Sequence, residues 1–196
     1  MTELTDVDDV VLLDLDGTPI GTAAKAAVHG PDTPLHLAFS CYVLNTDGEV
    51  LVTRRALTKR AWPGVWSNSF CGHPQPTETL VAAVHRRADF EIGVQLTDVE
   101  LALPVFRYRA TDSAGIVENE VCPVYVASMR GRVTPHPGEV MDHAWVDPAE
   151  LGRSVRATPW AFSPWLVLQA QLLPLLGGSL DSTTAAHPES SHEVLR

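Results

Sequence analysis

Lysine is scarce in this sequence of 196 residues, which contains only Lys25 and Lys59. Its 14 basic residues are outnumbered by 24 acidic ones, and the formal net charge is −10. Non-specific binding to nucleic acid depends on Lys and Arg neutralising phosphates, so this balance argues against a nucleic-acid partner. It does not exclude a small anion held in a local basic pocket.

Cysteine and long apolar runs are also scarce. The three cysteines, Cys41, Cys71 and Cys122, favour free thiols in a reducing compartment over a disulfide framework. No apolar run reaches the length that spans a membrane, and the N-terminus "MTELTDVDDVV" is acidic where a signal peptide would be basic. The sequence therefore predicts a cytoplasmic protein with no membrane partner, which we expect to be a monomer or weak dimer.

Strand patterns occur along most of the chain. "VVLLDLDGTPIG" predicts a strand that enters a tight turn at Asp16-Gly17, and "LHLAFSCYVLNTDGEVLVTRRA" predicts a hairpin closed by an Asp-Gly pair. Longer strand-like stretches cover 100–110 and 115–129, and a short one covers 143–147. The chain thus has many strands and few helices.

Helices are expected in three places. One runs over 79–90, with Thr77 or Thr79 as its cap and Gly93 ending it. A short helix begins at Pro148, and an apolar one covers 163–176. The mixture predicts an α/β sandwich in a single domain over 1–176, followed by a polar tail, 177–196, that we expect to be disordered.

The stretch "LLDLDGT" resembles the opening of the haloacid-dehalogenase phosphatases, in which Asp14 would be the nucleophile and Asp16 its acid–base partner. That fold also needs a downstream lysine and a paired acidic motif after another parallel strand. Both lysines of this chain come too early for it. We therefore interpret the stretch as an Asp-Gly turn between strands.

The stretch "SNSFCGHPQPTET" places a cysteine, a glycine and a histidine directly ahead of the expected central helix. Taken alone, Cys71 could be a nucleophile, a metal ligand, an acid–base group or ordinary core. From Gly72 onward, the spacing through Glu78, Arg86 and Glu91 resembles the Nudix box, a loop–helix–loop whose glutamates hold divalent metal against a diphosphate.

Two carboxylates of the usual Nudix box are missing, because Arg87 and Phe90 occupy their positions. The resemblance therefore implies the Nudix fold but not diphosphate hydrolysis. We expect Arg87 to bind phosphate oxygens directly. Glu91 is left to hold one Mg²⁺, with substrate phosphates completing the coordination.

Three long stretches make the resemblance more specific: "TRRALTKRAWPGVWSNSFCGHP", "FRYRATDSAGIVENEVCPVY" and "ATPWAFSPW". Together they resemble the type I isopentenyl-diphosphate isomerases, which are Nudix-fold enzymes, over approximately residues 9–175. The resemblance implies a mixed β-sheet sandwich flanked by helices, with extra N- and C-terminal elements. It also implies interconversion of isopentenyl and dimethylallyl diphosphate in isoprenoid biosynthesis.

That reaction protonates an unactivated alkene and removes a proton from an adjacent carbon of the tertiary cation, so it needs an acid and a base. The resemblance assigns these roles to Cys71 and Glu120, with Tyr108 beside Glu120 and Trp165 facing the cation. Nearby positive charge is expected to favour the thiolate form of Cys71. The other cysteines and tryptophans are expected in the core, namely Cys41, Cys122, Trp62, Trp66, Trp145 and Trp160.

The resemblance also implies a metal site and a diphosphate pocket. The metal ligands would be His29, His36, His73, Glu118 and Glu120, a nitrogen and oxygen set compatible with Mn²⁺, Zn²⁺ or Mg²⁺. The diphosphate would bind Lys25, Arg55, Lys59 and Arg87.

Two other functions fit the sequence less well. An ordinary Nudix hydrolase of nucleoside diphosphates would need the missing glutamates. A non-catalytic Nudix-fold binding module would be expected to lack Cys71, Glu120 or the metal ligands.

Overall fold

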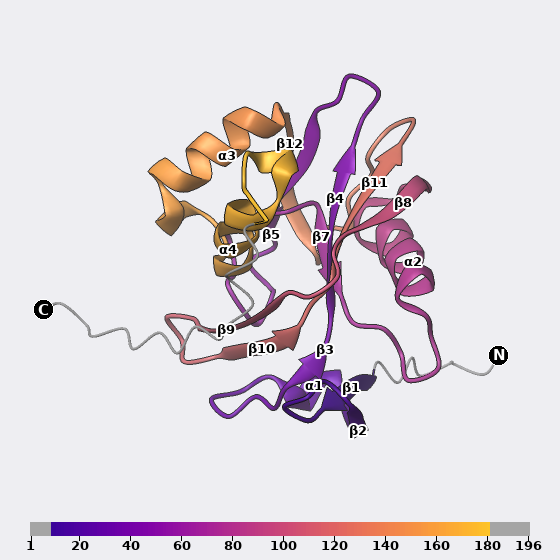
Figure 1. The fold of residues 1–196 in the computed structure, drawn as a ribbon, viewed down its shortest axis with the longest axis vertical. Helices are drawn as coiled ribbons and strands as arrows, with labels where there is room; N and C mark the ends of the chain where they lie inside the picture. The colour runs from indigo at the N-terminus through magenta and orange to yellow at the C-terminus, as the bar shows by residue number, and fades with distance from the viewer. Residues whose placement is uncertain (1–8, 181–196) are drawn as a thin grey trace, which may run out of the picture.

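The computed structural model describes residues 9–180, and its strands form two sheets (Figure 1). The larger sheet has seven strands, in the order β12-β5-β4-β11-β8, with β6 beside β5 and β7 beside β4. Its strands are β4 (Phe39–Leu44), β5 (Val50–Arg55), β6 (Trp66–Ser67), β7 (Phe70–Gly72), β8 (Leu96–Leu103), β11 (Val124–Met129) and β12 (Val140–Val146).

The smaller sheet has five strands in the order β2-β1-β3-β10-β9. They are β1 (Asp9–Leu13), β2 (Pro19–Ala24), β3 (His36–Leu37), β9 (Arg107–Thr111) and β10 (Val117–Val121). The α-helices are α1 (Lys25–Val28), α2 (Leu80–Ile92), α3 (Pro148–Ala157) and α4 (Pro164–Leu172). Among the described residues, no helix combines the length and apolar character needed to cross a bilayer.

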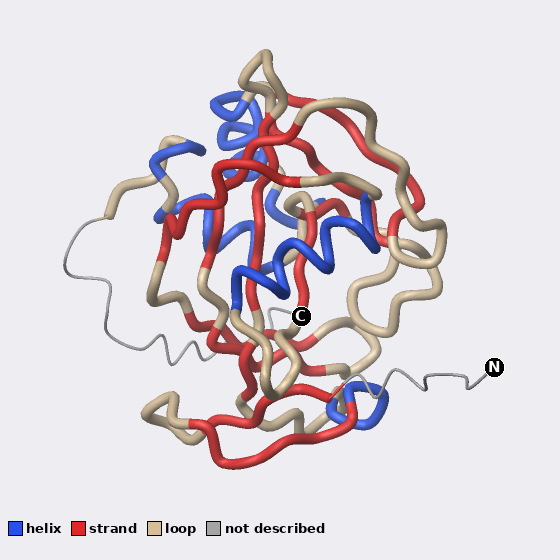
Figure 2. Tube along the Cα trace, turned by 90° about the vertical axis from the view of Figure 1, so that its right-hand side faces the viewer, coloured by secondary structure: helices blue, strands red, loops and turns tan. Residues whose placement is uncertain are grey.

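Helices cover both faces of the larger sheet. In Figure 1, α2 lies on one side of its strands and α3 and α4 lie on the other. Figure 2, which views the molecule from the α2 side, shows a helix crossing the strands, with the smaller sheet below. The predicted mixed α/β sandwich is therefore confirmed.

The central strand β4 shows how both faces become apolar. Side chains alternate along a strand, so successive residues of β4 point to opposite faces. Phe39, Cys41 and Val43 pack in the buried cluster that includes α2, whereas Tyr42 packs in the cluster that includes α3 and α4. Cys41 and Cys122 are buried free thiols, as predicted.

The two long strands predicted over 100–110 and 115–129 are each two strands in different sheets. Pro104 lies between β8 and β9, and Pro123 lies between β10 and β11. Proline lacks the N–H that would continue a ladder, so each stretch leaves one sheet and enters the other there. The hairpin predicted from "LHLAFSCYVLNTDGEVLVTRRA" forms, but β4 and β5 pair only at Leu44 and Val50 before β6 and β7 separate them.

The central helix follows its local signals. Thr79 caps α2 by accepting a hydrogen bond from the backbone N–H of Ala82, and Gly93 ends it in the left-handed region at φ 65°. The predicted terminal helix is shorter than expected, because α4 stops at Leu172 and Pro174 begins a 3₁₀ turn. The helix that begins at Pro148 is longer than expected and reaches Ala157.

The Asp-Gly turn near the N-terminus is confirmed. The Asp14 carboxylate accepts hydrogen bonds from the backbone N–H groups of Asp16 and Thr18, and β1 pairs antiparallel with β2. Asp14 thus closes a turn and does not head a parallel sheet. Of the expected tail, residues 177–180 are described and bond back to the end of α4 through Gly178 and Ser179, and 181–196 lie outside the described residues.

One core prediction is wrong. Trp160 is 83% exposed, because it lies in the short 3₁₀ turn between α3 and α4. Trp62, Trp66 and Trp145 are partly buried and pack against the core clusters.

Candidate active site

A cavity of about 470 Å³ opens where the two sheets meet. Every side chain that the sequence selected for catalysis, metal binding or diphosphate binding lines it, except His36. His36 is fully buried and forms hydrogen-bond contacts with His73, which does line the cavity. The structure therefore brings together residues spread from Lys25 to Trp165.

Strand β10 determines where Glu120 lies. Glu120 pairs with His36 of β3 on one side and with Tyr108 of β9 on the other. The Tyr108 hydroxyl donates a 2.9 Å hydrogen bond to Glu120 Oε2, while Oε1 lies 3.2 Å from His73 Nε2 and 3.5 Å from His36 Nε2. Glu118 is two residues earlier and so faces the same side of the strand.

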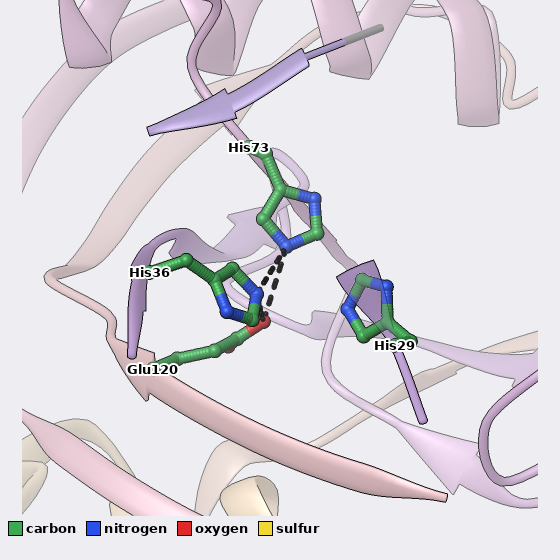
Figure 3. A group of neighbouring side chains, drawn as sticks. All are labelled: His29, His36, His73 and Glu120. Carbon is green, nitrogen blue, oxygen red and sulfur yellow. Dashed lines mark hydrogen bonds and ion pairs between the residues drawn. The ribbon is translucent and has the colours of Figure 1, made fainter. Parts of the chain in front are cut away.

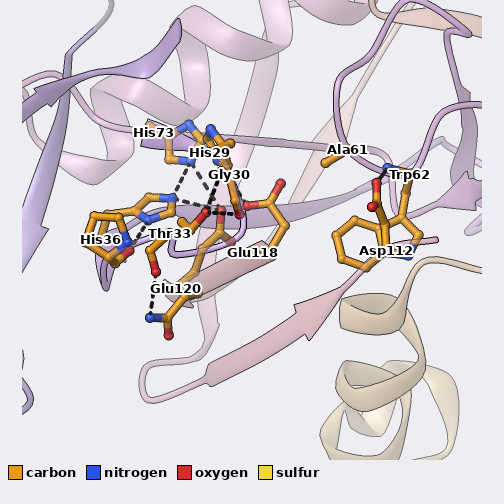
Figure 4. A network of polar contacts seen from close by, with 12 residues as sticks. His29, Gly30, Thr33, His36, Ala61, Trp62, His73, Asp112, Glu118 and Glu120 are labelled. Atoms are coloured by element: carbon orange, nitrogen blue, oxygen red, sulfur yellow. Dashed lines mark hydrogen bonds and ion pairs between the residues drawn. The ribbon is translucent and has the colours of Figure 1, made fainter. Parts of the chain in front are cut away.

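The segment from His29 to His36 is held by its own turn. Thr33 Oγ1 accepts a hydrogen bond from Gly30 N and donates one to Gly30 O, and the Asn119 amide donates to Thr33 O (Figure 4). His29 follows α1 and lies 3.0 Å from Glu118, and His73 follows β7. Figure 3 shows the imidazoles of His36 and His73 directed at the Glu120 carboxylate, with His29 across from them.

These side chains fit a metal ion. One ligand atom from each of His29, His36, His73 and Glu120 lies within 4.8 Å of every other. Bonds of about 2.1 Å to a shared ion would leave such atoms at most about 4.2 Å apart, so small side-chain movements suffice. His36 Nδ1 donates to the Pro34 carbonyl over 2.9 Å, so Nε2 is the ring nitrogen that faces the cluster.

Protonation states also suit metal binding. Burial lowers the pKa of His73 to about 4, which keeps that imidazole neutral. Burial alone would raise the pKa of Glu120, but its hydrogen bonds with His36 and His73 hold it well below its usual value. Glu120 is therefore ionised, as a metal ligand or a base must be.

Cys71 lies in a polar setting built by β4 and β7. It pairs with Ser40 across these strands, and the Ser40 hydroxyl lies 3.3 Å from the Cys71 sulfur. The thiol also donates to Asn68 Oδ1 over 3.3 Å. Because the Asn68 amide nitrogen donates to two backbone carbonyls, those of Cys41 and Phe70, its oxygen is the atom that faces the thiol.

The expectation that positive charge favours the Cys71 thiolate is wrong. Burial raises the pKa of Cys71 to about 12, and neither the Ser40 hydrogen bond nor the charge of Arg55 offsets it. Cys71 therefore carries a proton at neutral pH. The cavity contains a protonated thiol and an ionised carboxylate, which is the combination that an acid–base pair requires.

Trp165 lies against the same cavity and is fixed by two hydrogen bonds. Its indole N–H is 3.0 Å from Ser67 Oγ and 2.9 Å from Asn68 Oδ1. The Arg55 guanidinium lies 5.2 Å from the ring centroid. An indole held in this way offers its π face to a cation without acting as a base.

Two basic side chains of the cavity, Arg87 and Lys59, are paired with carboxylates of the protein. Arg87 donates to Glu91 one turn later on α2 and is 94% buried. Lys59 pairs with Glu139, and Glu139 Oε1 lies 3.5 Å from Arg87. Gly72 lets β7 pack this closely against α2, because a Cβ there would lie 2.7 Å from the Arg87 side chain.

Sequence reasoning missed three residues of the site. Ser40 and Asn68 contact Cys71, and Glu139 contacts Lys59. Asn68 was within the stretch quoted for Cys71, so its position was a usable signal. Ser40 is brought to Cys71 by strand pairing and Glu139 by the start of β12, and no local pattern indicates either.

Comparison with known proteins identifies the fold and the relatives of this chain. The NUDIX domain model matches residues 34–167. Among solved structures, the crystal structure of DR0079 from Deinococcus radiodurans superposes with a TM-score of 0.64 at 18% identity, covering 83% of this chain and 96% of that one. At that identity the likeness shows the fold alone.

Curated relatives are much closer in sequence. The chain is 67% identical over 173 residues to the isopentenyl-diphosphate Delta-isomerase of Agromyces mediolanus, covering 88% of this chain and 84% of the relative. It is 60% identical over 176 residues to the protein of that name from Paenarthrobacter aurescens, covering 87% and 96%. With the protein of that name from Klebsiella pneumoniae subsp. pneumoniae the identity is 56% over 164 residues, covering 84% and 89%.

Proposed function

Because the chain belongs to the isopentenyl-diphosphate Delta-isomerase family of Nudix-fold enzymes, we propose that Cys71 and Glu120 are the acid–base pair of its reaction. The enzyme interconverts isopentenyl and dimethylallyl diphosphate in isoprenoid biosynthesis. The observation that carries the assignment is one cavity lined by a protonated thiol, an ionised carboxylate and a basic end.

The basic end binds the diphosphate and the acid–base pair acts on the alkene. Lys25, Arg55, Lys59 and Arg87 anchor the phosphates, and Glu91 would hold a Mg²⁺ ion beside them. One member of the pair delivers a proton to the terminal alkene carbon, and the other removes a proton from the carbon on the far side of the cation. Trp165 stabilises the positive charge between these two steps.

The cluster of His29, His36, His73, Glu118 and Glu120 would hold a second divalent ion, for which Mn²⁺, Zn²⁺ and Mg²⁺ are the candidates. One atom supports this assignment. Glu118 Oε2 is buried without a hydrogen-bond partner among the described residues, and it lies 3.0 Å from His29 Nε2. Such an ion, when bound, supplies positive charge that fixes Glu120 and orients His73 near Cys71.

The metal assignment predicts the outcome of a chelation experiment. Purified protein should contain about one divalent ion before substrate is added, and His36→Ala should lose it. Removal of the ion should abolish formation of dimethylallyl diphosphate, and adding back one ion with Mg²⁺ should restore it. His85→Ala is the matched control, because His85 is an exposed residue of α2 outside the cavity. Metal content equal in the parent and His36→Ala proteins would contradict the assignment.

A further inference from the structure

Glu139 is an acidic residue inside a basic pocket. It immediately precedes β12 and lines the same cavity as Cys71 and Trp165. Its carboxylate forms an ion pair with Lys59, and its other oxygen lies 3.5 Å from Arg87. Both cations belong to the set that we assign to the diphosphate, so Glu139 lies where an anionic ligand has to bind.

The backbone around Glu139 is fixed, and its side chain extends from that fixed point. Its carbonyl accepts a 2.9 Å hydrogen bond from Ala56 N, and its own N–H donates to the His136 carbonyl over 3.0 Å. The next residue, Val140, pairs with Arg55 of β5. Because this backbone is fixed, the Glu139 carboxylate can leave Lys59 by rotation of its side chain, without any movement of the strand.

Glu139 is charged in the ligand-free protein. Burial alone would raise its pKa, but Lys59, Arg87 and Lys25 hold the pKa of this carboxyl below its usual value. The side chain is 16% exposed and that of Lys59 is 22% exposed, so their ion pair is largely shielded from solvent. A diphosphate that entered with Glu139 still on Lys59 would face a like charge at close range, and such contacts are strongly unfavourable.

An internal carboxylate beside Lys59 would help the enzyme to release its product. Isomerisation leaves the diphosphate unchanged, so the basic groups bind the product as tightly as the substrate. Interactions of equal strength before and after the chemical step add nothing to its rate, and they slow release of the product. An internal carboxylate that takes back one of the cations offsets part of that binding when the product leaves.

From this geometry we propose that Glu139 is a displaceable counter-anion, which yields Lys59 to the incoming diphosphate and takes it back on release. The inference rests on the proposed function, in which the basic end of the cavity holds the diphosphate. It assigns Glu139 a role in binding and release, with no contact to the reacting carbons.

Binding of inorganic pyrophosphate tests the inference without requiring turnover. Calorimetric titrations in Mg²⁺ buffer would compare the parent protein with Glu139→Gln, which keeps the shape of the side chain and removes its charge. The dissociation constant of Glu139→Gln should be roughly tenfold lower than that of the parent, because no charged group competes for Lys59. Stopped-flow measurement should show slower release of pyrophosphate from the variant.

Two further variants separate the explanations. Glu150→Gln changes the net charge equally, but Glu150 pairs with Arg153 on the exposed face of α3 and should leave pyrophosphate affinity unchanged. Lys59→Met should weaken binding in the parent background, which establishes that pyrophosphate occupies the basic end. Glu139→Ala should tighten binding as Glu139→Gln does, and thermal unfolding would confirm that each variant is folded.

The results that would contradict the inference can be told apart from those that would contradict the proposed function. Unchanged or weaker binding by Glu139→Gln, with binding that still depends on Lys59, would overturn the counter-anion role and leave the proposed function intact. Weaker binding only when Mg²⁺ is present would assign Glu139 to the metal instead. Binding that is indifferent to Lys59→Met would overturn the diphosphate assignment and this inference with it.

Discussion

Cys71 and Glu120, the proposed acid–base pair, are in opposite protonation states, and each state has a local cause. Burial raises the pKa of the Cys71 thiol to about 12, so the sulfur keeps its proton. His36 and His73 hold the pKa of Glu120 well below its usual value even though burial opposes them. Two titratable groups whose environments push their pKa values apart are the usual basis of acid–base catalysis.

Substitution at either group is therefore expected to stop the reaction. Cys71→Ala and Glu120→Gln should each lower turnover by at least about 10²–10⁴-fold, because each removes a group that transfers a proton. The measurement is the rate of dimethylallyl diphosphate formation at saturating substrate, with circular dichroism to verify the fold.

Cys41→Ala provides a matched control for the thiol. Cys41 is fully buried on the α2 side of β4 and does not line the cavity. Its substitution should lower stability by about 1 kcal/mol while leaving turnover close to that of the parent. Near-parent turnover by Cys71→Ala or Glu120→Gln would contradict the assigned roles.

How far the sequence predicts individual residues depends on whether they lie in a recognisable stretch. Cys71 and Glu120 lie in stretches that resemble a known family. Their charge states do not follow from the sequence, because burial decides the pKa of Cys71 and burial is a property of the assembled sheets. Glu139 illustrates the other limit, since an isolated glutamate before a strand carries no signal until Lys59 is placed beside it.

At the scale of elements, α2 is the piece of structure that the sequence specifies most completely. Its cap, its helical spacing and its terminal glycine are all local signals, and each has its expected role in the structure. One face of the helix packs Ala83 and Val84 against the sheet, and the adjacent face directs Arg87 and Glu91 into the cavity. The end of α2 is thus important for the proposed diphosphate pocket as well as for folding.

Alanine at Gly93 tests how firmly that end is fixed. Gly93 has φ 65°, and a Cβ there would lie 2.1 Å from Thr134 Oγ1, so both the backbone and the neighbouring segment would have to shift. We expect Gly93→Ala to lower the free energy of unfolding by about 3 kcal/mol or more in urea titrations.

Gly48→Ala is the control for this change. Gly48 has a similar φ of 79° in the β4–β5 turn, but within residues 9–180 no atom outside its own neighbours lies within 4 Å of the added Cβ. It should lower stability by only about 1 kcal/mol, which is the contribution of the backbone conformation. Equal losses for the two variants would mean that Thr134 adapts freely and that the clash at Gly93 is unimportant.

The strands show what local patterns leave open. Apolar and β-branched residues predict that 100–110 and 115–129 are extended, and they are. The patterns do not say which sheet each half joins, although Pro104 and Pro123 mark the points of change. Strands as short as β6 and β7 cannot be predicted from hydrophobic periodicity, because two or three residues show no alternation.

At the scale of the whole molecule, the site exists only because two sheets meet. The smaller sheet and its loops supply His29, His36 and Glu120, whereas Cys71 and the residue after β7, His73, come from the larger one. Trp165 lines the same cavity and comes from α4, which lies on the face of the larger sheet opposite α2. The family resemblance predicts which residues belong to the site, but the order of the strands in the two sheets is what brings them to one cavity.

The number of carboxylates available for metal binding distinguishes an isomerase from a hydrolase of the same fold. Hydrolysis of a diphosphate needs several carboxylates to hold the metals that activate water. The resemblance to the Nudix box assigns one such position to Arg87, a cation, and another to Phe90, whose ring stacks on His136. We therefore propose that Glu91 anchors the diphosphate and that the set of ligands for hydrolysis is incomplete.

Phosphorus NMR of the protein incubated with isopentenyl diphosphate and Mg²⁺ distinguishes isomerisation from hydrolysis. Dimethylallyl diphosphate should accumulate until both isomers are at equilibrium, with no inorganic phosphate or pyrophosphate above the background of a protein-free sample. Each product has its own phosphorus signals, so one spectrum reports both reactions. Release of phosphate or pyrophosphate by the parent protein, without allylic product, would mean that the enzyme is a hydrolase and not an isomerase.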